Sequence, residues 1–339
     1  MMDVKETIDG LANEQGVSGT LLVKQGDEVR LEMSYGFANK AEKIENNLHT
    51  RFGVASGCKL FTAIGIAQLV DQGLLTFDTK LKDCLELSFP NFDDRVTIHH
   101  LLTHTSGVPD YFDEEVMNDY EDLWKTRPVY TITKPEDFLP MFQDGNMLFH
   151  PGERFHYNNA GYILLGLVIQ QLSGMNFTDY IEEKVFKECG MVDSGYFSSD
   201  CLPENTALGY IEDKEEGTWK TNIFSIPIKG GPDGGAYVTA PDMVKVWEAL
   251  FSYKLISKSV TDQMLQPYME VNNFLRYGYG MWMNEGERGI YKYHVMGFDP
   301  GVRFRASYYP EKDLKIIAAC NNEVDPFDMV KTIEDEFLE

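Results

Sequence analysis

The chain has 339 residues, and its 54 acidic and 30 basic side chains give a formal net charge of −24 at pH 7. A hydrophobic content of 43%, with 13% aromatic residues, is typical of a folded globule and excludes disorder as the main state. The negative charge repels nucleic-acid phosphates and anionic headgroups, and no cluster of Lys and Arg offsets it, so both are disfavoured as partners.

The N-terminus carries interspersed acids and lacks the basic segment and apolar run of a secretory signal. The longest nearly apolar stretch, residues 160–169, is too short for a membrane span. We therefore expect a cytoplasmic protein with no membrane span, or an exported one if a native leader precedes this sequence. The five cysteines have no zinc or haem spacing, so we expect no metal site.

Strand patterns occupy both ends of the chain. Residues 19–38 alternate around a Gly-containing turn at residues 25–27, which predicts a β-hairpin. Four further strand-like runs lie near the C-terminus, at residues 276–283, 291–297, 301–309 and 314–320. Asp325 and Pro326 then predict an N-cap and first residue for a closing helix over 325–337.

The middle of the chain is helical and rich in loops. Residues 63–73 and 159–174 read as amphipathic helices that end at Gly73 and Gly174. This order predicts an α+β fold, in which an antiparallel sheet built from both termini is flanked by helices and interrupted by a mainly helical region. We expect a single domain over residues 1–339, with a sheet lobe at about 1–56 and 236–339 and a helical lobe at about 57–235.

The first chemical motif is the tetrad Ser56-Gly57-Cys58-Lys59, which opens the first strong helical pattern. Residues three apart share a helix face, so the Lys59 amine lies near the Ser56 hydroxyl. A serine at a helix N-terminus has a free backbone N–H and the positive end of the helix dipole beneath it, which favours a developing oxyanion. The tetrad alone is common, but its geometry is that of an acyl-transfer nucleophile and its base.

Several further motifs follow this tetrad in a recognisable order. They are TIHHLLTHTSGVPDY at 97–111, FHPGERFHYNNAGYILLGLVIQQLSG at 149–174, GGPDGGAYVTAPDM at 230–243 and YGYGMW at 277–282. Over about residues 15–320 the chain resembles the serine β-lactamase and penicillin-binding-protein superfamily, in particular its class C β-lactamase, D,D-peptidase and esterase branch. The resemblance implies the S-x-x-K nucleophile and base for Ser56 and Lys59.

The resemblance also implies a Tyr-x-Asn motif, which Tyr157-Asn158-Asn159 matches. Tyr157 would then shuttle the Ser56 proton to the leaving group, and Asn159 would bind a substrate amide. Whether Lys59 or Tyr157 is the principal base stays open. His99, His100 and His104 look like a metal cluster, but their spacing on a helix does not converge on one ion.

The third family motif departs from its usual pattern. Its Lys or His normally precedes a strand glycine by two residues, and the turn Pro300-Gly301 places that glycine at Gly297 and the cationic position at Val295. His294 is one residue too early, so it points away from the site unless a bulge turns it inward as a substrate-binding residue. Valine cannot hold a substrate carboxylate, which weakens the case for β-lactamase or carboxypeptidase activity.

Two other residues of this motif keep an expected role. Gly297 permits close approach of the substrate, and the Phe298 N–H would pair with that of Ser56 to form an oxyanion hole. Arg303 and Arg305 on the next strand are candidate substitutes for the missing cation.

The sequence therefore predicts a serine hydrolase that forms an acyl-enzyme on an ester, amide or β-lactam carbonyl without a metal or organic cofactor. The substrate would be a small molecule or peptide, and we expect an ester to be turned over better than a penicillin or a D-Ala-D-Ala peptide. The alternatives are a D-amino-acid peptidase and a non-catalytic penicillin-binding or sensor-type module that has kept the fold. The physiological substrate and the oligomeric state do not follow from the sequence.

Overall fold

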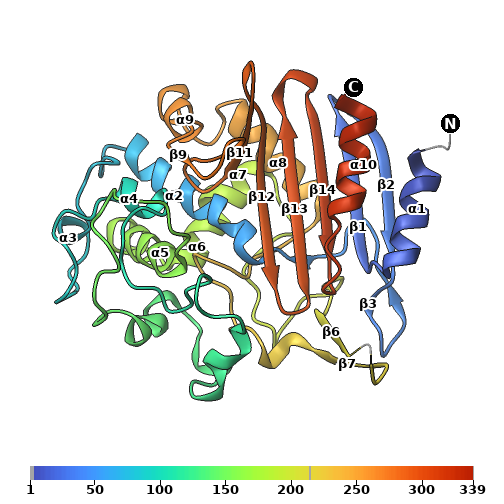
Figure 1. Cartoon of the computed structure of the whole chain (residues 1–339), viewed down its shortest axis with the longest axis horizontal. Coiled ribbons are helices and arrows are strands. Elements are labelled where there is room, and N and C mark those ends of the chain that lie inside the picture. Colours follow the sequence, from blue (N-terminus) through green and yellow to red (C-terminus); the bar gives the residue numbers. More distant parts are fainter. Residues whose placement is uncertain (1–3, 214, 339) are drawn as a thin grey trace.

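The structure is a computed structural model that describes residues 4–213 and 215–338, and its main feature is a large antiparallel sheet. Within these residues the sheet has eight strands in the order β2-β1-β14-β13-β12-β11-β10-β9. Strands β1 and β2 come from the start of the chain and the others from its end, and the two groups join where β1 pairs with β14 (Figure 1). The α+β prediction and the N-terminal hairpin are confirmed.

The elements have the following bounds. The sheet strands are β1 (Gly19–Gln25), β2 (Glu28–Tyr35), β9 (Met269–Glu270), β10 (Leu275–Tyr277), β11 (Trp282–Gly286), β12 (Gly289–Asp299), β13 (Val302–Tyr309) and β14 (Leu314–Cys320). Three small pairs join β3 (Phe37–Asn39) to β4 (Ile44–Glu45), β5 (Phe52–Gly53) to β8 (Tyr237–Val238), and β6 (Tyr210–Asp213) to β7 (Thr218–Thr221). The helices are α1 (Val4–Gln15), α2 (Lys59–Asp71), α3 (Leu81–Cys84), α4 (Ile98–Leu102), α5 (Asn159–Ser173), α6 (Phe177–Ile181), α7 (Lys187–Cys189), α8 (Ala240–Phe251), α9 (Lys258–Met264) and α10 (Phe327–Leu338).

Each face of the sheet has its own hydrophobic core. Because side chains alternate along a strand, Val23 and Ile316 pack under α1 and α10, which lie together in front of the sheet in Figure 1. Leu22 and Ile317, one residue away from these, pack into the larger core that contains α2, α5 and α8. The sheet therefore separates a small core from the large one that borders the helical region.

The two predicted helices of the middle region are present as α2 and α5. Gly73 and Gly174, the predicted stops, both adopt the left-handed backbone that glycine tolerates without strain. The prediction that these two helices are amphipathic is wrong, because residues Lys59 to Leu69 of α2 and Asn159 to Ile169 of α5 are buried on all sides. A helix that is enclosed by its neighbours has no solvent-exposed face on which polar residues would gather.

Two other expectations near the C-terminus change. The run at 276–283 is not one strand, because a tight turn with Gly280 in a left-handed conformation separates β10 from β11. Asp325 was predicted to cap α10, but its carboxylate instead accepts two hydrogen bonds from the Arg305 guanidinium, both at 2.6 Å. Arg305 is thus committed to the α10 side of the sheet.

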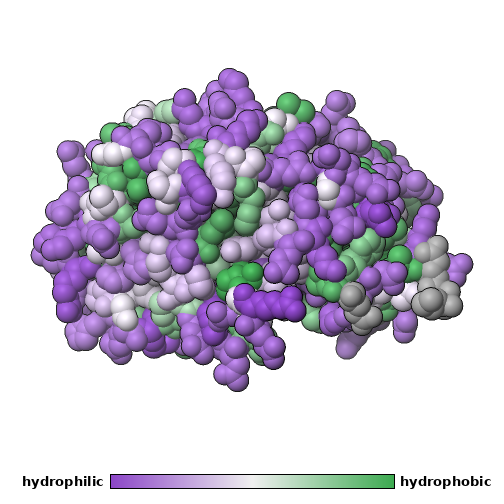
Figure 2. Space-filling model, turned by 90° about the horizontal axis from the view of Figure 1, so that it is seen from above, coloured by the Kyte–Doolittle hydropathy of each residue, from purple (hydrophilic) through white to green (hydrophobic). Residues whose placement is uncertain are grey.

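The face in Figure 2 is mostly hydrophilic, and its apolar side chains form separate patches. Across residues 4–213 and 215–338, every helix is too short or too polar to cross a bilayer. The division into a sheet lobe and a helical lobe within one domain stays a prediction.

The small core makes a stability prediction. Ile333 on α10 is fully buried against the sheet, whereas Glu336 on the same helix is exposed. We expect Ile333→Ala to lower the free energy of unfolding by about 3 kcal/mol through lost burial and the cavity left behind. Glu336→Ala, the control on the same helix, should change it by less than about 0.5 kcal/mol in urea denaturation. Equal effects of the two substitutions would contradict this packing.

Candidate active site

Ser56 lies in a short 3₁₀ turn, Ala55–Cys58, that connects β5 to α2. Ala55 has a φ of +45°, a left-handed conformation that costs a non-glycine residue roughly 1–2 kcal/mol. The Gly57 N–H donates to the Val54 carbonyl at 2.8 Å and closes the turn. The turn leaves the Ser56 side chain half-buried at the edge of a pocket.

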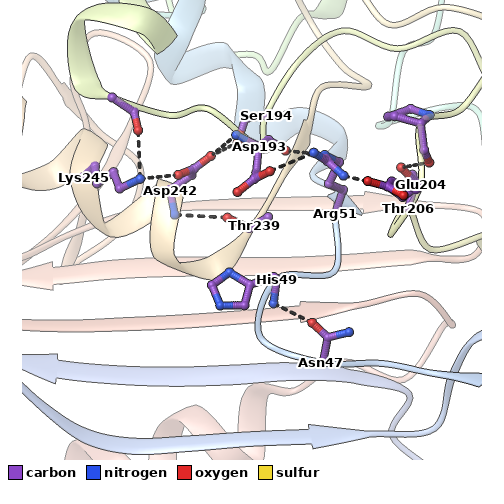
Figure 3. Close-up of polar contacts among 12 residues, drawn as sticks. Asn47, His49, Arg51, Asp193, Ser194, Glu204, Thr206, Thr239, Asp242 and Lys245 are labelled. Atoms are coloured by element: carbon purple, nitrogen blue, oxygen red, sulfur yellow. Dashed lines mark hydrogen bonds and ion pairs between the residues drawn. The ribbon is translucent and has the colours of Figure 1, made fainter.

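The strand that leads into this turn is anchored by an ion network (Figure 3). The Arg51 guanidinium donates to the Asp193 carboxylate at 2.8 Å and to the backbone carbonyls of Asp193 and Glu204. The buried Asp242 carboxylate in turn accepts hydrogen bonds from the Ser194 hydroxyl at 2.8 Å and from Lys245 at 2.7 Å. These bonds tie β5 to the loop after α7 and to the first turn of α8.

Lys59 is the buried cation of the site, with only 1% of its surface exposed. Its Nζ donates to the Ser56 Oγ at 3.0 Å, to the Asn159 Oδ1 at 2.8 Å and to the Asp233 backbone carbonyl at 2.7 Å. An ammonium group has three N–H bonds, so these three acceptors satisfy it completely. This removes most of the cost of burying the charge.

The loop that supplies the Asp233 carbonyl is held by α2 and the turn before it. The Thr62 hydroxyl donates to the Pro232 carbonyl at 2.6 Å, and the Cys58 thiol contacts the Gly231 carbonyl at 3.5 Å. Burial raises the pKa of the Cys58 thiol to about 12, so Cys58 is an inert packing group rather than a second nucleophile. Three carbonyls of one loop are therefore fixed by side chains within one stretch of five residues, 58–62.

Tyr157 faces both Ser56 and Lys59. Its hydroxyl interacts with the Ser56 hydroxyl, and Lys59 Nζ lies 4.9 Å from the centre of its ring. Burial, followed by the charge of Glu114, raises the pKa of Tyr157 well above its usual value, while the Ser56 hydrogen bond opposes this shift. Tyr157 is therefore a neutral phenol at ordinary pH.

Asn159 is the first residue of α5, and the start of this helix is capped from two sides. The Asn158 side chain accepts from the Gly161 N–H at 2.6 Å, as an N-cap should. The Asp110 carboxylate accepts from the Asn159 N–H at 2.7 Å and the Ala160 N–H at 2.9 Å. These bonds fix the helix end that presents the Asn159 carboxamide to Lys59.

The third motif lies on β12, and its register against β13 is unbroken from Tyr293 to Asp299. No bulge therefore turns His294 inward, and the structure does not bring His294 to the site. Its imidazole lies on the α10 face, where it lines a small cavity of about 20 Å³ with Arg305 and Ser307. Val295 points into the large core instead, so the position expected to hold a carboxylate carries a buried aliphatic side chain.

Gly297 brings β12 directly against the Ser56 turn. A Cβ at this position would lie 2.0 Å from the Val54 carbonyl oxygen and 2.9 Å from the Ser56 nitrogen, so only glycine fits. Phe298 lines the pocket beside it, and its ring packs against the guanidinium groups of Arg303 and Arg305 at 5.4 Å.

The pocket beside Ser56 has a volume of about 700 Å³ and an acidic lining. Among the described residues that line it, the acids are Glu114, Asp119, Asp233, Asp299 and Glu323, and the bases are Lys229 and Arg303. Burial, followed by the charge of Asp233, raises the pKa of Asp299 to about 7. Arg303 donates to the Asp299 and Val302 carbonyls, which turns part of its guanidinium toward the backbone.

The structure thus brings together Ser56, Lys59, Tyr157, Asn159 and Gly297, with Phe298 at the pocket wall. The sequence interpretation missed Asp233, Asp110 and Asp299. The glycine-rich run GGPDGG at 230–235 indicated a tight loop near the site. Only the path of that loop in the structure shows that the Asp233 carbonyl accepts the hydrogen bond from Lys59. Within the described part of the chain, no group of three His, Cys, Asp or Glu residues is placed to hold a metal ion.

Comparisons with known proteins agree on one family. A family model described as Beta-lactamase matches residues 4–337. A solved penicillin-binding protein from Bacillus halodurans is 51% identical, with a TM-score of 0.93 over 97% of this chain and 100% of that chain. A curated penicillin-binding protein of Bacillus subtilis (strain 168) is 30% identical in an alignment of 334 residues that covers 93% of this chain and 70% of that protein. A D-amino acid amidase from Ochrobactrum anthropi, at 20% identity and a TM-score of 0.79 over 98% of both chains, shares the fold.

The contact at Gly297 makes a prediction. Gly297→Ala should force β12 away from the Ser56 turn, lower the free energy of unfolding by about 1–3 kcal/mol and reduce ester turnover more than tenfold. Gly10→Ala on α1, where a Cβ meets no atom within 4 Å, is the control and should leave turnover unchanged. Urea denaturation and ester hydrolysis measure the two effects. Wild-type turnover in Gly297→Ala would show that the strand can move without disturbing Ser56.

Proposed function

The chain belongs to the β-lactamase family, and from this premise we propose that it is a serine hydrolase that works through an acyl-enzyme on Ser56. The observation that carries the proposal is the environment of the Lys59 amine. Once the Lys59 ammonium releases a proton to solvent, its two remaining N–H bonds point to the carbonyl oxygens of Asn159 and Asp233. Its lone pair then faces the Ser56 hydroxyl at 3.0 Å, which is the geometry of a nucleophile and its general base.

The protonation of Tyr157 favours Lys59 as the first base. Because its raised pKa keeps Tyr157 a phenol, it is a proton donor at the start of the reaction rather than an acceptor. In the proposed acylation Ser56 Oγ attacks the carbonyl carbon and its proton passes to Lys59. Tyr157 then protonates the leaving group and recovers a proton from the Lys59 ammonium. Water then attacks the acyl carbon and gives a proton to the neutral Lys59 amine. The bond between Ser56 Oγ and the acyl carbon breaks, Lys59 returns the proton to Ser56 Oγ, and the acid product leaves.

The backbone supplies the proposed oxyanion site. The Ser56 N–H stands at the start of a helical segment, and β12 passes close to it at Gly297. We assign the Phe298 N–H as the second donor, since two converging N–H groups stabilise the charge that develops on the carbonyl oxygen. Asn159 would also bind a substrate amide, because only its Oδ1 is used by Lys59 and its amide hydrogens face the pocket and the Phe112 carbonyl at 3.3 Å.

Covalent labelling tests the nucleophile. A fluorophosphonate, which reacts with activated serines, should add one group to the protein, and peptide mass spectrometry should place it on Ser56. Ser56→Ala should abolish both the label and ester turnover, and Lys59→Met should slow both by at least about 100-fold, the scale of general-base catalysis. If Ser56 stays unlabelled while a penicillin-binding relative labels in parallel, the protein is a binding module rather than a hydrolase.

The pocket favours neutral or cationic substrates. Its acidic residues outnumber its basic ones, and Val295 replaces the cation that the family uses for a substrate carboxylate. A like charge on the substrate is repelled by such a lining, and the overall charge of −24 adds to this field at long range. We propose esters or amides without a carboxylate near the scissile bond as the substrate class.

Thioesters with different leaving-group charges test this class. Acetylthiocholine, its neutral 3,3-dimethylbutyl analogue and S-acetyl-3-mercaptopropionate carry positive, zero and negative charge. We expect kcat/KM to fall about tenfold from the first to the last, or about 1.4 kcal/mol. Since Asp299 gains its charge as the pH rises through about 7, the gap should widen between pH 6 and 8 and shrink in Asp299→Asn. Robust nitrocefin hydrolysis without ester turnover would contradict the proposed class.

A further inference from the structure

His104 is a buried imidazole next to the site that the proposed reaction does not use. It lies two residues after the end of α4, and only 1% of its surface is exposed. Its ring centre lies 4.3 Å from the ring centre of Tyr157, on whose face it packs at an angle of 36°. It belongs to the motif at residues 97–111, in which the sequence interpretation considered His104 only as part of a metal cluster and rejected it.

His104 accepts two hydrogen bonds, one from each chain neighbour of Tyr157. The His104 carbonyl accepts from the His156 N–H at 2.8 Å. The His104 Nδ1 accepts from the Asn158 N–H at 3.0 Å. Both neighbours of Tyr157 are therefore fixed to one residue, whose ring also supports the phenol from the side.

The hydrogen bond that Nδ1 accepts determines the tautomer of His104. Because Nδ1 accepts a backbone N–H, the proton is on Nε2, which lies 3.1 Å from the Tyr277 hydroxyl. The Tyr277 hydroxyl is 3.5 Å from that of Tyr162, and Tyr162 donates to the Leu102 carbonyl at 3.0 Å. Burial, followed by the charge of Lys59, holds the pKa of His104 well below its usual value, so the ring stays neutral and keeps this tautomer.

The backbone of His104 is also unusual. Its φ is +57°, in the left-handed region that is uncommon for non-glycine residues, although Asn, Asp and His adopt it more often than the others. The turn around it is closed by the Thr105 N–H, which donates to the His100 carbonyl at 2.9 Å. This conformation sends the His104 carbonyl and its side chain toward the same segment, residues 156–158.

We propose that His104 is a positioning residue that holds the Tyr157 phenol against Ser56 through the Nδ1 bond to the Asn158 N–H. The proposal rests on the proposed function, since it assigns Tyr157 the transfer of a proton. His104 itself touches neither the substrate nor the reacting atoms. The nearby Lys59 changes its protonation during the reaction, and a neutral His104 adds no competing charge.

Two amide substitutions separate the two ring nitrogens. In His104→Asn, Oδ1 takes the place of Nδ1, and Asn also tolerates the left-handed backbone. In His104→Gln, the amide nitrogen takes the place of Nε2 and keeps the contact with Tyr277, while the bond to Asn158 is lost. Tyr277→Phe is the matched control, because it removes the partner of Nε2 and leaves the Nδ1 bond intact.

We expect His104→Gln to lower kcat for an ester at least 20-fold with KM within threefold, and to slow Ser56 labelling to match. His104→Asn and Tyr277→Phe should each keep kcat within fivefold of the wild type. A structural role alone would lower the melting temperature of the variants without separating Asn from Gln in kcat.

Three outcomes overturn the proposal: wild-type kcat in folded His104→Gln, a loss in His104→Asn as large as in His104→Gln, or a loss in Tyr277→Phe of that size. If His104→Gln does not fold, the other two variants decide, and a tenfold loss of kcat in either overturns the proposal.

Labelling of the wild type distinguishes this test from the test of the proposed function. A wild type that does not label refutes the hydrolase, whereas a labelled wild type with equally fast His104→Gln refutes only the role of His104.

Discussion

The site depends on a lysine ammonium that is buried in the core. Moving a charge from water into a protein interior is costly unless the charge is fully hydrogen-bonded, and removing one partner leaves an unsatisfied charge. The partners of Lys59 come from the nucleophile turn, from the first residue of α5 and from the 230–235 loop. The burial of Lys59 at the start of α2 therefore requires three segments that are far apart in the sequence to lie together.

Small residues allow these segments to approach one another. A Cβ on Gly166 of α5 would lie 2.0 Å from the Pro232 ring, and one on Gly65 of α2 would lie 2.9 Å from the Ile169 side chain. The loop that carries the Asp233 carbonyl is thus pressed between α2 and α5. Packing on this scale, rather than any single polar contact, sets the distance from Lys59 to its acceptors.

The sequence predicts the sheet, α2, α5 and the polar side chains of the site, because strand alternation, glycine stops and linked motifs are local signals. The register argument also places His294 on the far side of β12, as the unbroken ladder shows. The Asp233 acceptor is different, since it is a backbone carbonyl that any residue supplies and only the path of the loop defines. The role of His104 likewise depends on a contact over about fifty residues, and the burial of α2 on all sides depends on neighbours that its own pattern does not encode.

Two of the described non-glycine residues with a positive φ lie where the proposed nucleophile and proton donor need a fixed direction. Ala55 directly precedes Ser56, and His104 holds the segment of Tyr157, and both adopt left-handed conformations while almost fully buried. Such conformations persist only when the surrounding contacts outweigh their cost. At Ala55 those contacts are the close approach of β12 at Gly297, and at His104 they are the bonds to residues 156 and 158. Because relaxing either residue would break these contacts, β12 on one side and the turn after α4 on the other fix the backbone next to Ser56 and Tyr157.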